Sequence, residues 1–374
     1  MTLIRSIIWL PLILPFCAKA QQTHLPSNKA PSVIAYYSGD AASIARIHTD
    51  RITHIIYSFG HLNGDTIAIG RNGAEQTLRT LAALKKEHPA LKVQVALGGW
   101  GGCQTCSAVF ATEMGREDFA RSAKRLCERF GIDGIDLDWE YPAIEGFPGH
   151  PFQPGDREHF TELLRSMRKH LARDAEISFA VGAFPRFIDS SVDWRAVEPL
   201  VNRINLMSYD LVTEGAPVTG HHTPLYSTPR QDLSADRSIT QLREMGFPLN
   251  KIALGCAFYA RSFGPVDDID HGLSQPGPFN AYIPYRKLME IRSSDTSIHL
   301  YRDTTAMAPW LYSAATRTFY TFDDRVSLEA KTRYVMERGL NGIMFWELSL
   351  DTSDGELLGT IYRTIQEARK PQHQ

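Results

Sequence analysis

Three acidic residues recur at every second position in one short segment of the chain. Asp136, Asp138 and Glu140 alternate there with large apolar residues, and we call these three the acid row. In a β-strand, side chains two positions apart project from the same face, so the three carboxyl groups would lie in line. Burial and mutual repulsion would hold at least one proton on the row above its normal pKa. This prepares a general acid for work near neutral pH.

A hydrogen-bonded cluster with a structural role, or a metal site, would also place acids in such a row. A calcium site would more often take its oxygen ligands from loop residues and backbone carbonyls than from one strand. Because buried acids are costly, catalysis is the favoured interpretation. Asp133 is out of phase with the row and is expected at the entrance of the strand.

Short apolar runs recur along the chain, and amphipathic stretches with helical spacing separate most of them. They predict eight strands: Val33–Tyr37, His54–Phe59, Val93–Leu97, Gly134–Tyr141, Ile177–Val181, Ile204–Tyr209, Ile252–Phe258 and Gly342–Trp346. Strands that alternate with helices pair in parallel, so the pattern predicts an α/β fold, a (β/α)8 TIM barrel over residues 30–370. Glu140, the last acid of its run, would lie nearest the C-terminal mouth, where barrel enzymes keep their active sites.

The spacing between the last two predicted strands is unusually long. About 80 residues separate them, whereas the crossover helix near Ser327–Arg338 needs only about 12–15. The surplus, residues 263–318, contains Pro, Gly, Tyr and short β-like pieces. We therefore expect a small inserted subdomain beside one rim of the barrel, between strands seven and eight.

Residues 1–20 have the pattern of a secretory signal peptide. A basic residue precedes the apolar run Ile7–Cys17, and small residues occupy both positions of an A-x-A site that ends at Ala20. The run is too short for a membrane anchor and is interrupted by proline. A lipid-modified Cys17 is the weaker alternative, because the bulky Phe16 precedes it. Cleavage near Ala20 would leave a secreted or periplasmic protein.

Composition and cysteine content narrow the class of protein. The chain has 374 residues, of which 43% are hydrophobic and 22% charged, so global disorder is excluded. Its formal net charge of −2 disfavours nucleic-acid binding. In an oxidising compartment the C-x-x-C pair of Cys103 and Cys106 predicts a small local disulfide, and zinc would need a second ligand pair. Cys127 and Cys256 lie in apolar patterns and are expected to be core thiols.

One segment resembles the signature of an enzyme family. Residues Asp133 to Pro142, D-G-I-D-L-D-W-E-Y-P, resemble the D-x-x-D-x-D-x-E motif of glycoside hydrolase family 18, the chitinases and their relatives. Five more motifs resemble the family's second, third, sixth, seventh and eighth strands in order: Thr53–Phe59, Leu97–Trp100, Met207–Asp210, Phe258–Phe263 and Gly342–Glu347. Ala96 stands where the family often has Ser, and Ala260 where it usually has Gly. We expect these departures to tune proton sharing or loop shape without abolishing activity.

The resemblance implies a role for each residue of the acid row and for several residues around it. Glu140 would protonate the glycosidic oxygen, Asp138 would orient the substrate's acetamido group, and Asp136 would share a proton with Asp138. Tyr209 would hydrogen-bond the acetamido oxygen, and Trp346 would form the floor beneath the sugar. The remaining substrate-binding residues that it implies are Trp100, Met207, Asp210, Tyr259 and Arg261.

Four aromatic and histidine residues outside these motifs have types that can bind ligands. Trp194 is expected to pack, whereas Trp310 in the insertion could either pack or bind sugar. His221 and His222 are neighbours in a loop and cannot easily point together, so we expect no metal site and no cofactor.

The resemblance therefore implies a secreted chitinase-type hydrolase that cleaves β-1,4-linked N-acetylglucosamine chains by a retaining, substrate-assisted mechanism. Its partner would be chitin or an N-acetylglucosamine oligosaccharide, with no nucleic acid and no membrane span, and we expect a monomer. Two alternatives stay open: an endo-β-N-acetylglucosaminidase that acts on N-glycans, and a non-catalytic chitinase-like lectin. The presence of Glu140 argues against the lectin. The insertion, residues 263–318, resembles the α+β insertion subdomain of chitinases, which deepens the cleft for a long chain, and so favours the chitinase. The sequence does not decide between endo and exo action.

Overall fold

The computed structural model describes residues 30–70 and 72–370, and the predicted signal peptide lies outside these ranges. Eight parallel strands form a closed barrel, which confirms the predicted (β/α)8 fold. Around the barrel they are β1 (Ser32–Tyr37), β14 (Gly342–Trp346), β8 (Ile252–Ala257), β7 (Arg203–Met207), β6 (Glu176–Gly182), β5 (Gly134–Asp138), β4 (Lys92–Gly98) and β2 (His54–Asn63). Pairing of β1 with β2 closes the ring, and β3 (Thr66–Ile69) runs antiparallel to the end of β2.

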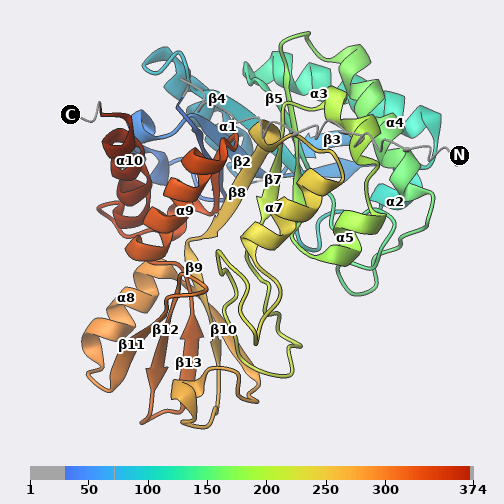
Figure 1. Ribbon diagram of the computed structural model, residues 1–374. Helices are drawn as coiled ribbons and strands as arrows, with labels where there is room; N and C mark the ends of the chain where they lie inside the picture. Colours follow the sequence, from blue (N-terminus) through green and yellow to red (C-terminus); the bar gives the residue numbers. More distant parts are fainter. Residues whose placement is uncertain (1–29, 71, 371–374) are drawn as a thin grey trace, which may run out of the picture.

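Helices cover the outside of the barrel, and Figure 1 shows α3 and α4 on the opposite side from α9 and α10. The α-helices are α1 (Ala74–Ala83), α2 (Cys106–Phe110), α3 (Glu113–Phe130), α4 (Asp156–His170), α5 (Pro185–Ser190), α6 (Trp194–Val197), α7 (Ala235–Glu244), α8 (Tyr285–Ser294), α9 (Arg325–Arg338) and α10 (Glu356–Arg369). Local signals fix their ends: Thr112 caps α3, and Asp324 forms a capping box with Ser327 in α9. Within the described ranges, no helix is long and apolar enough to cross a membrane.

The side chains of β5 alternate between two environments, as the sequence predicts. Ile135 and Leu137 are buried in the apolar layer between the barrel and its helices, and the acid row faces the lumen. The strand is shorter than predicted: it ends at Asp138 and does not reach Tyr141. The reason is that its neighbour β4 ends at Gly98, directly opposite Asp138, so the backbone beyond has no strand on that side to pair with.

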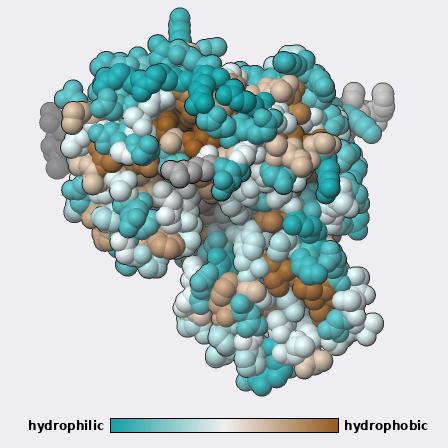
Figure 2. Space-filling view, turned by 180° about the vertical axis from the view of Figure 1, so that it is seen from behind, coloured by the Kyte–Doolittle hydropathy of each residue, from teal (hydrophilic) through white to brown (hydrophobic). Residues whose placement is uncertain are grey.

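Between β8 and α9 the chain forms a second sheet, which carries helix α8. Its five antiparallel strands are ordered β10 (Phe279–Pro284), β9 (Tyr259–Phe263), β13 (Thr318–Thr321), β12 (Ala308–Ser313) and β11 (Ile298–Asp303). The sheet extends a few residues beyond 263–318 on both sides. Strand β9 begins directly after Phe258, one residue past the end of β8, and β13 ends at Thr321. In Figure 1 this sheet lies at the end of the barrel to which β8 leads, and in Figure 2 it forms a smaller lobe joined to the barrel by a narrower waist.

Candidate active site

The acid row lies in the barrel lumen and is almost entirely buried. Asp136 and Asp138 belong to β5, and Glu140 follows two residues after the strand ends. The exposed fraction rises from 0% for Asp136 to 5% for Asp138 and 9% for Glu140. The row therefore runs from the sealed interior toward the C-terminal mouth.

Three uncharged donors hold Asp136. The Tyr36 hydroxyl donates to Oδ2 at 2.7 Å, and the Ser178 hydroxyl and the Asn205 amide donate to Oδ1 at 2.6 and 3.0 Å. Burial raises the pKa of Asp136, whereas these hydrogen bonds lower it. Because both oxygens accept, the geometry fits an ionised carboxylate. Asp136 lies between Ala96 and Ser178 in the sheet, so Ser178 supplies a hydroxyl that Ala96 lacks.

Asp138 occupies the middle of the row and has fewer partners. Its Oδ1 atom is buried and accepts no hydrogen bond from the residues that the structure describes. Burial, followed by repulsion from Glu140 and Asp136, raises the pKa of Asp138 well above its usual value. Since Asp136 is held as an acceptor, Asp138 is the one of the two aspartates that binds a proton more readily. The unpartnered oxygen is left for a donor on a bound molecule.

Glu140 ends the row at the mouth. Burial raises the pKa of Glu140 to about 7, while a hydrogen bond with Tyr141 opposes the rise and repulsion from Asp210 adds to it. A large share of Glu140 therefore carries its proton at neutral pH, as a general acid must.

Tyr209 and Asp210 follow β7 and extend the site toward the insertion. The Tyr259 hydroxyl donates to Asp210 Oδ1 at 2.6 Å, and Arg261 Nε donates to the same oxygen at 2.5 Å. Burial opposes ionisation of Asp210, but the nearby His222 and the hydrogen-bonded guanidinium of Arg261 hold its pKa far below the usual value. Asp210 therefore stays negatively charged and fixes Tyr259, whose ring packs edge-on against Tyr209 with centroids 6.1 Å apart.

Aromatic side chains around the mouth offer flat surfaces for a sugar ring. Trp346, at the end of β14, stacks on Phe59 with ring centroids 5.4 Å apart. Trp100, after β4, is 59% exposed. Tyr282 of the insertion stacks on Tyr259 at 4.5 Å. Because sugars have apolar C–H faces, such surfaces can bury them with little loss of side-chain entropy.

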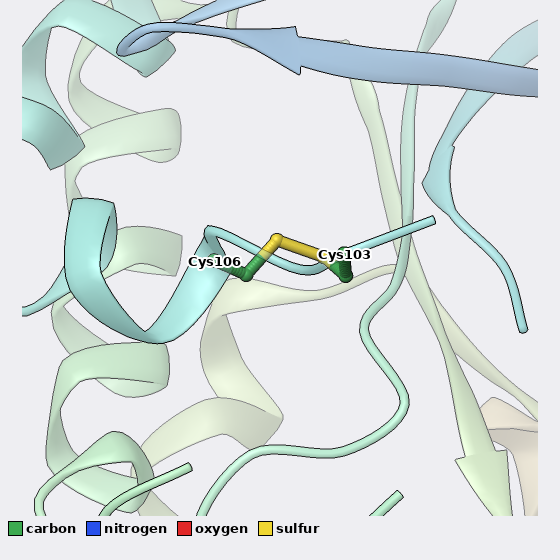
Figure 3. Close-up of a disulfide and its surroundings, with 2 residues drawn as sticks. All are labelled: Cys103 and Cys106. Atoms are coloured by element: carbon green, nitrogen blue, oxygen red, sulfur yellow. A yellow bond between two sulfur atoms is a disulfide. The ribbon is translucent and has the colours of Figure 1, made fainter. Parts of the chain in front are cut away.

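A disulfide between Cys103 and Cys106 closes the loop that follows β4, as the sequence predicts. Figure 3 shows this bond at the start of helix α2, and both cysteines are buried. The end of β4, just before this loop, approaches the acid row closely. A Cβ atom at Gly98, whose φ is 110°, would come within 2.2 Å of the Asp138 carbonyl oxygen, so the close approach requires glycine.

We expect replacement of both disulfide cysteines by serine to lower the free energy of unfolding by about 2 kcal/mol, because the bond closes a short loop. Urea unfolding of the double variant measures this loss. Cys127→Ser, which removes a free thiol, is the matched control. An unchanged free energy of unfolding in the double variant would show that the bond does not restrict the unfolded chain.

Outside the family motifs, four residues have side chains of types that can bind ligands. Trp194 is 3% exposed among core rings, and Trp310 is 6% exposed in the core of the insertion, so both pack. His221 and His222 lie near two different carboxylates. Among the residues that the structure describes, no group of three His, Cys, Asp or Glu side chains could hold a metal ion.

Met207, Cys127 and Cys256 lie within or against the apolar clusters of the barrel. Met207 ends β7 and packs against the residues of the lumen. Cys127 and Cys256 are free thiols, and burial raises the pKa of Cys127 to about 12 and that of Cys256 further. Both therefore stay protonated. Cys256 is a buried core thiol, as predicted, whereas Cys127 is half-buried at the edge of the core.

The structure brings to the site several residues for which the sequence predicts no role. Tyr36, Ser178 and Asn205 hold the innermost aspartate, and Tyr282 joins the aromatic surface. The first three are polar residues at inward-facing positions of predicted strands, and this pattern could have identified them. His222, which lies beside Asp210, had no such signal, because the sequence does not predict the course of its loop.

Comparison with known proteins places these features in context. The model of the family described as Glycosyl hydrolases family 18 matches residues 32–351. Chitotriosidase-1 of Mus musculus is 30% identical over 322 residues, 81% of this chain and 68% of that protein. Chitinase A1 of Niallia circulans is 30% identical over 302 residues, 73% of this chain and 42% of that protein. The solved structure of a glycoside hydrolase family 18 N-acetylglucosaminidase from Paenibacillus barengoltzii is 32% identical with a TM-score of 0.81, covering 89% of this chain and 99% of that one.

Proposed function

The chain belongs to glycosyl hydrolases family 18 and is a chitinase-type glycoside hydrolase, and we propose that it cleaves β-1,4-linked N-acetylglucosamine chains by a retaining, substrate-assisted mechanism. The observation that supports this proposal best is the acid row. It combines a held carboxylate at its base, a buried unpartnered oxygen on Asp138 and an acid with a pKa of about 7 at the mouth.

In the first step, Glu140 donates its proton to the glycosidic oxygen as the bond from that oxygen to C1 breaks. The acetamido carbonyl oxygen of the same sugar attacks C1 and forms an oxazolinium ion, so the substrate supplies the nucleophile. The unpartnered oxygen of Asp138 accepts the acetamido N–H. The negative charge of the Asp136 and Asp138 pair stabilises the cation.

In the second step, water attacks C1 on the face that the leaving group vacated. Glu140, now a carboxylate, takes a proton from this water, and the bond between C1 and the acetamido oxygen breaks. The sugar regains its acetamido group with retained configuration, and Glu140 is protonated again. Tyr209 hydrogen-bonds the acetamido oxygen, and Trp346 supports the sugar. The proposed substrate-binding residues also include Trp100, Met207, Asp210, Tyr259 and Arg261.

We expect kcat/KM to fall as the pH rises above about 7, because the reaction needs Glu140 with its proton and its pKa is raised to about 7. The sign follows from the acid role: a carboxyl group loses its proton, and with it its function, above its pKa. The pH dependence of hydrolysis of a soluble chitin oligomer measures this limb. A rate that stays constant from pH 6 to pH 9 would contradict the assignment.

A second candidate function is the release of single N-acetylglucosamine units. It is favoured by the similarity to the Paenibacillus N-acetylglucosaminidase, of which the chain covers 99%. Only the shared fold supports an endo-β-N-acetylglucosaminidase that acts on N-glycans or a non-catalytic lectin.

Digestion of chitin hexamer and of a high-mannose glycoprotein in parallel, followed by mass spectrometry of the products, separates these functions. We expect the hexamer to be cleaved and the glycoprotein to stay intact. Shortening of the hexamer by single units alone indicates the N-acetylglucosaminidase. Glycan release without hexamer cleavage, or binding without any product, would overturn the proposed function.

We also propose that residues 1–20 direct export, with cleavage near Ala20, so that the mature protein is secreted or periplasmic and acts as a monomer. The disulfide between Cys103 and Cys106 supports an oxidising compartment.

A further inference from the structure

A buried arginine lies beneath the acid row. Arg203 is the first residue of β7, and it is 2% exposed. It shares the inward face of β7 with Asn205, which donates to Asp136. The proposed mechanism makes no use of this guanidinium group. Because a buried charge is costly unless other groups compensate it, its presence in the lumen calls for a physical explanation.

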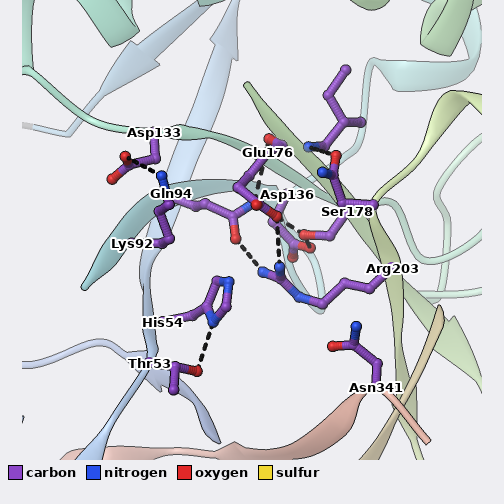
Figure 4. A network of polar contacts seen from close by, with 12 residues as sticks. Thr53, His54, Lys92, Gln94, Asp133, Asp136, Glu176, Ser178, Arg203 and Asn341 are labelled. Carbon is purple, nitrogen blue, oxygen red and sulfur yellow. Dashed lines mark hydrogen bonds and ion pairs between the residues drawn. The ribbon is translucent and has the colours of Figure 1, made fainter. Parts of the chain in front are cut away.

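The partners of Arg203 are few, as Figure 4 shows. Its Nη1 atom lies 3.0 Å from Glu176 Oε2, and its Nη2 atom donates to Gln94 Oε1. Its Nε atom has no hydrogen-bond partner among the described residues. The Glu176 side chain is 18% exposed, so water weakens this ion pair. The Glu176 carboxylate therefore neutralises only part of the charge of Arg203, and the rest attracts the carboxylates of the acid row.

A chain of hydrogen bonds leads from Arg203 to Asp136. A guanidinium group has only donors, so the Gln94 side chain must turn its oxygen toward Arg203. Its amide nitrogen then donates to Ser178 Oγ at 3.1 Å, and the Ser178 hydroxyl is left to donate to Asp136 Oδ1 at 2.6 Å. Arg203 thus sets the direction of every donor in this chain.

We propose that Arg203 is a positioning residue that keeps Asp136 an acceptor-only carboxylate, so that the proton shared by the two aspartates stays on Asp138. This inference rests on the proposed function for the role of the acid row. Burial raises the pKa of Asp136, while hydrogen bonds from Ser178 and Tyr36 and the charge of Arg203 lower it. The chain of hydrogen bonds and the charge of Arg203 therefore both lower the pKa of Asp136.

Several groups besides Arg203 influence the protonation of the acid row. Glu176, Asp136 and Tyr36 interact electrostatically with Arg203, while Asp138 is repelled by Asp136 and Glu140. The titratable or charged groups around Arg203 and the acid row include His54 on β2, Tyr36 on β1, Glu176 on β6, Tyr141 after β5, and Tyr209 and Asp210 after β7. On β8 and β14, the residues that pack in the lumen are uncharged: Ala253, Ala257, Met344 and, at the mouth, Trp346. Arg203 is the cation that acts directly on Asp136.

Two variants test the proposal because they change the charge beneath the acid row in opposite directions. Arg203→Met removes a positive charge, which raises the carboxylate pKa values. Both limbs of the kcat/KM profile, the acidic limb set by the Asp136 and Asp138 pair and the alkaline limb set by Glu140, should then move to higher pH by about 0.5–1 unit. Glu176→Gln removes a negative charge and should move both limbs to lower pH. Arg203→Lys keeps the charge and is expected to restore the limbs to their wild-type positions.

A purely structural role of Arg203 would lower activity or stability without moving the limbs. Limbs that stay in place in both charge variants, or that move in the same direction, would overturn the proposal. If Arg203→Met does not fold, the direction of the shift in Glu176→Gln decides the question alone.

A measurement without turnover separates this proposal from the proposed function. Carboxyl carbons of aspartate labelled with ¹³C report their titration by NMR in the free protein. We expect the Asp136 signal, assigned with Asp136→Asn, to titrate at higher pH in Arg203→Met than in the wild type. An unchanged Asp136 titration overturns the role of Arg203, whereas a shifted titration without hydrolysis of chitin oligomers overturns only the proposed function.

Discussion

Replacement of Glu140 by Gln should lower kcat for chitin hexamer by about 10³-fold or more, because the variant can neither protonate the leaving oxygen nor activate water. The substitution keeps the size and polarity of the side chain, so the Kd for the oligomer should stay within a few-fold of the wild type. Steady-state initial rates measure kcat, and calorimetric titration at pH 6 measures the Kd.

Two controls separate loss of chemistry from loss of structure. Glu145→Gln neutralises an exposed carboxylate in the same loop and should leave kcat unchanged. Thermal unfolding at pH 8 should show Glu140→Gln to be at least as stable as the wild type. Burial raises the pKa of Glu140, so its ionised form costs stability at this pH, whereas glutamine stays neutral. Near wild-type hydrolysis by Glu140→Gln would remove Glu140 from the acid role.

Asp138→Asn should lower kcat by about 10²–10³-fold, because the pair of Asp136 and Asp138 can then no longer shift its negative charge onto the oxygen beside the oxazolinium ion. Asparagine can still accept the acetamido N–H through its oxygen, so binding of the uncleaved chain should change little. A cyclic thiazoline analogue of the intermediate should lose more affinity than the chain does. Comparison of the two binding constants with kcat therefore distinguishes charge stabilisation from simple positioning.

The matched control for this variant is Asp133→Asn. Asp133 precedes β5 at the opposite end, where its carboxylate contacts Lys85 at 2.8 Å and accepts the backbone N–H of Val93. Its loss should reduce stability but leave kcat within about twofold of the wild type. Equal losses of kcat in the two variants would mean that Asp138 acts only through the fold.

The sequence was sufficient for the barrel and for the acid row because both follow from short-range periodicity. Alternation within Gly134–Asp138 places Ile135 and Leu137 outside and the acids inside, whatever the neighbouring strands are. The end of the strand was predicted three residues too late, since it depends on where β4 stops.

The partners of the acid row could not be predicted in the same way. Tyr36 lies 100 residues from Asp136 in the sequence, and Asn205 lies 69 residues from it, so only the closed barrel brings them together. The same holds for Tyr282, which reaches Tyr259 through antiparallel pairing within the insertion. Arg203 was not identified because the predicted strand begins at Ile204, and a charged residue at the end of a strand is expected to face water.

The central proposal is that the acetamido group of the substrate acts as the nucleophile above the acid row. Time-resolved ¹H NMR of the first product released from chitin hexamer tests it most directly, with cellohexaose as a matched chain that lacks the acetamido group. We predict that the β-anomer forms before mutarotation and that cellohexaose is not cleaved. Initial release of the α-anomer, or cleavage of cellohexaose at a comparable rate, would contradict the proposed mechanism.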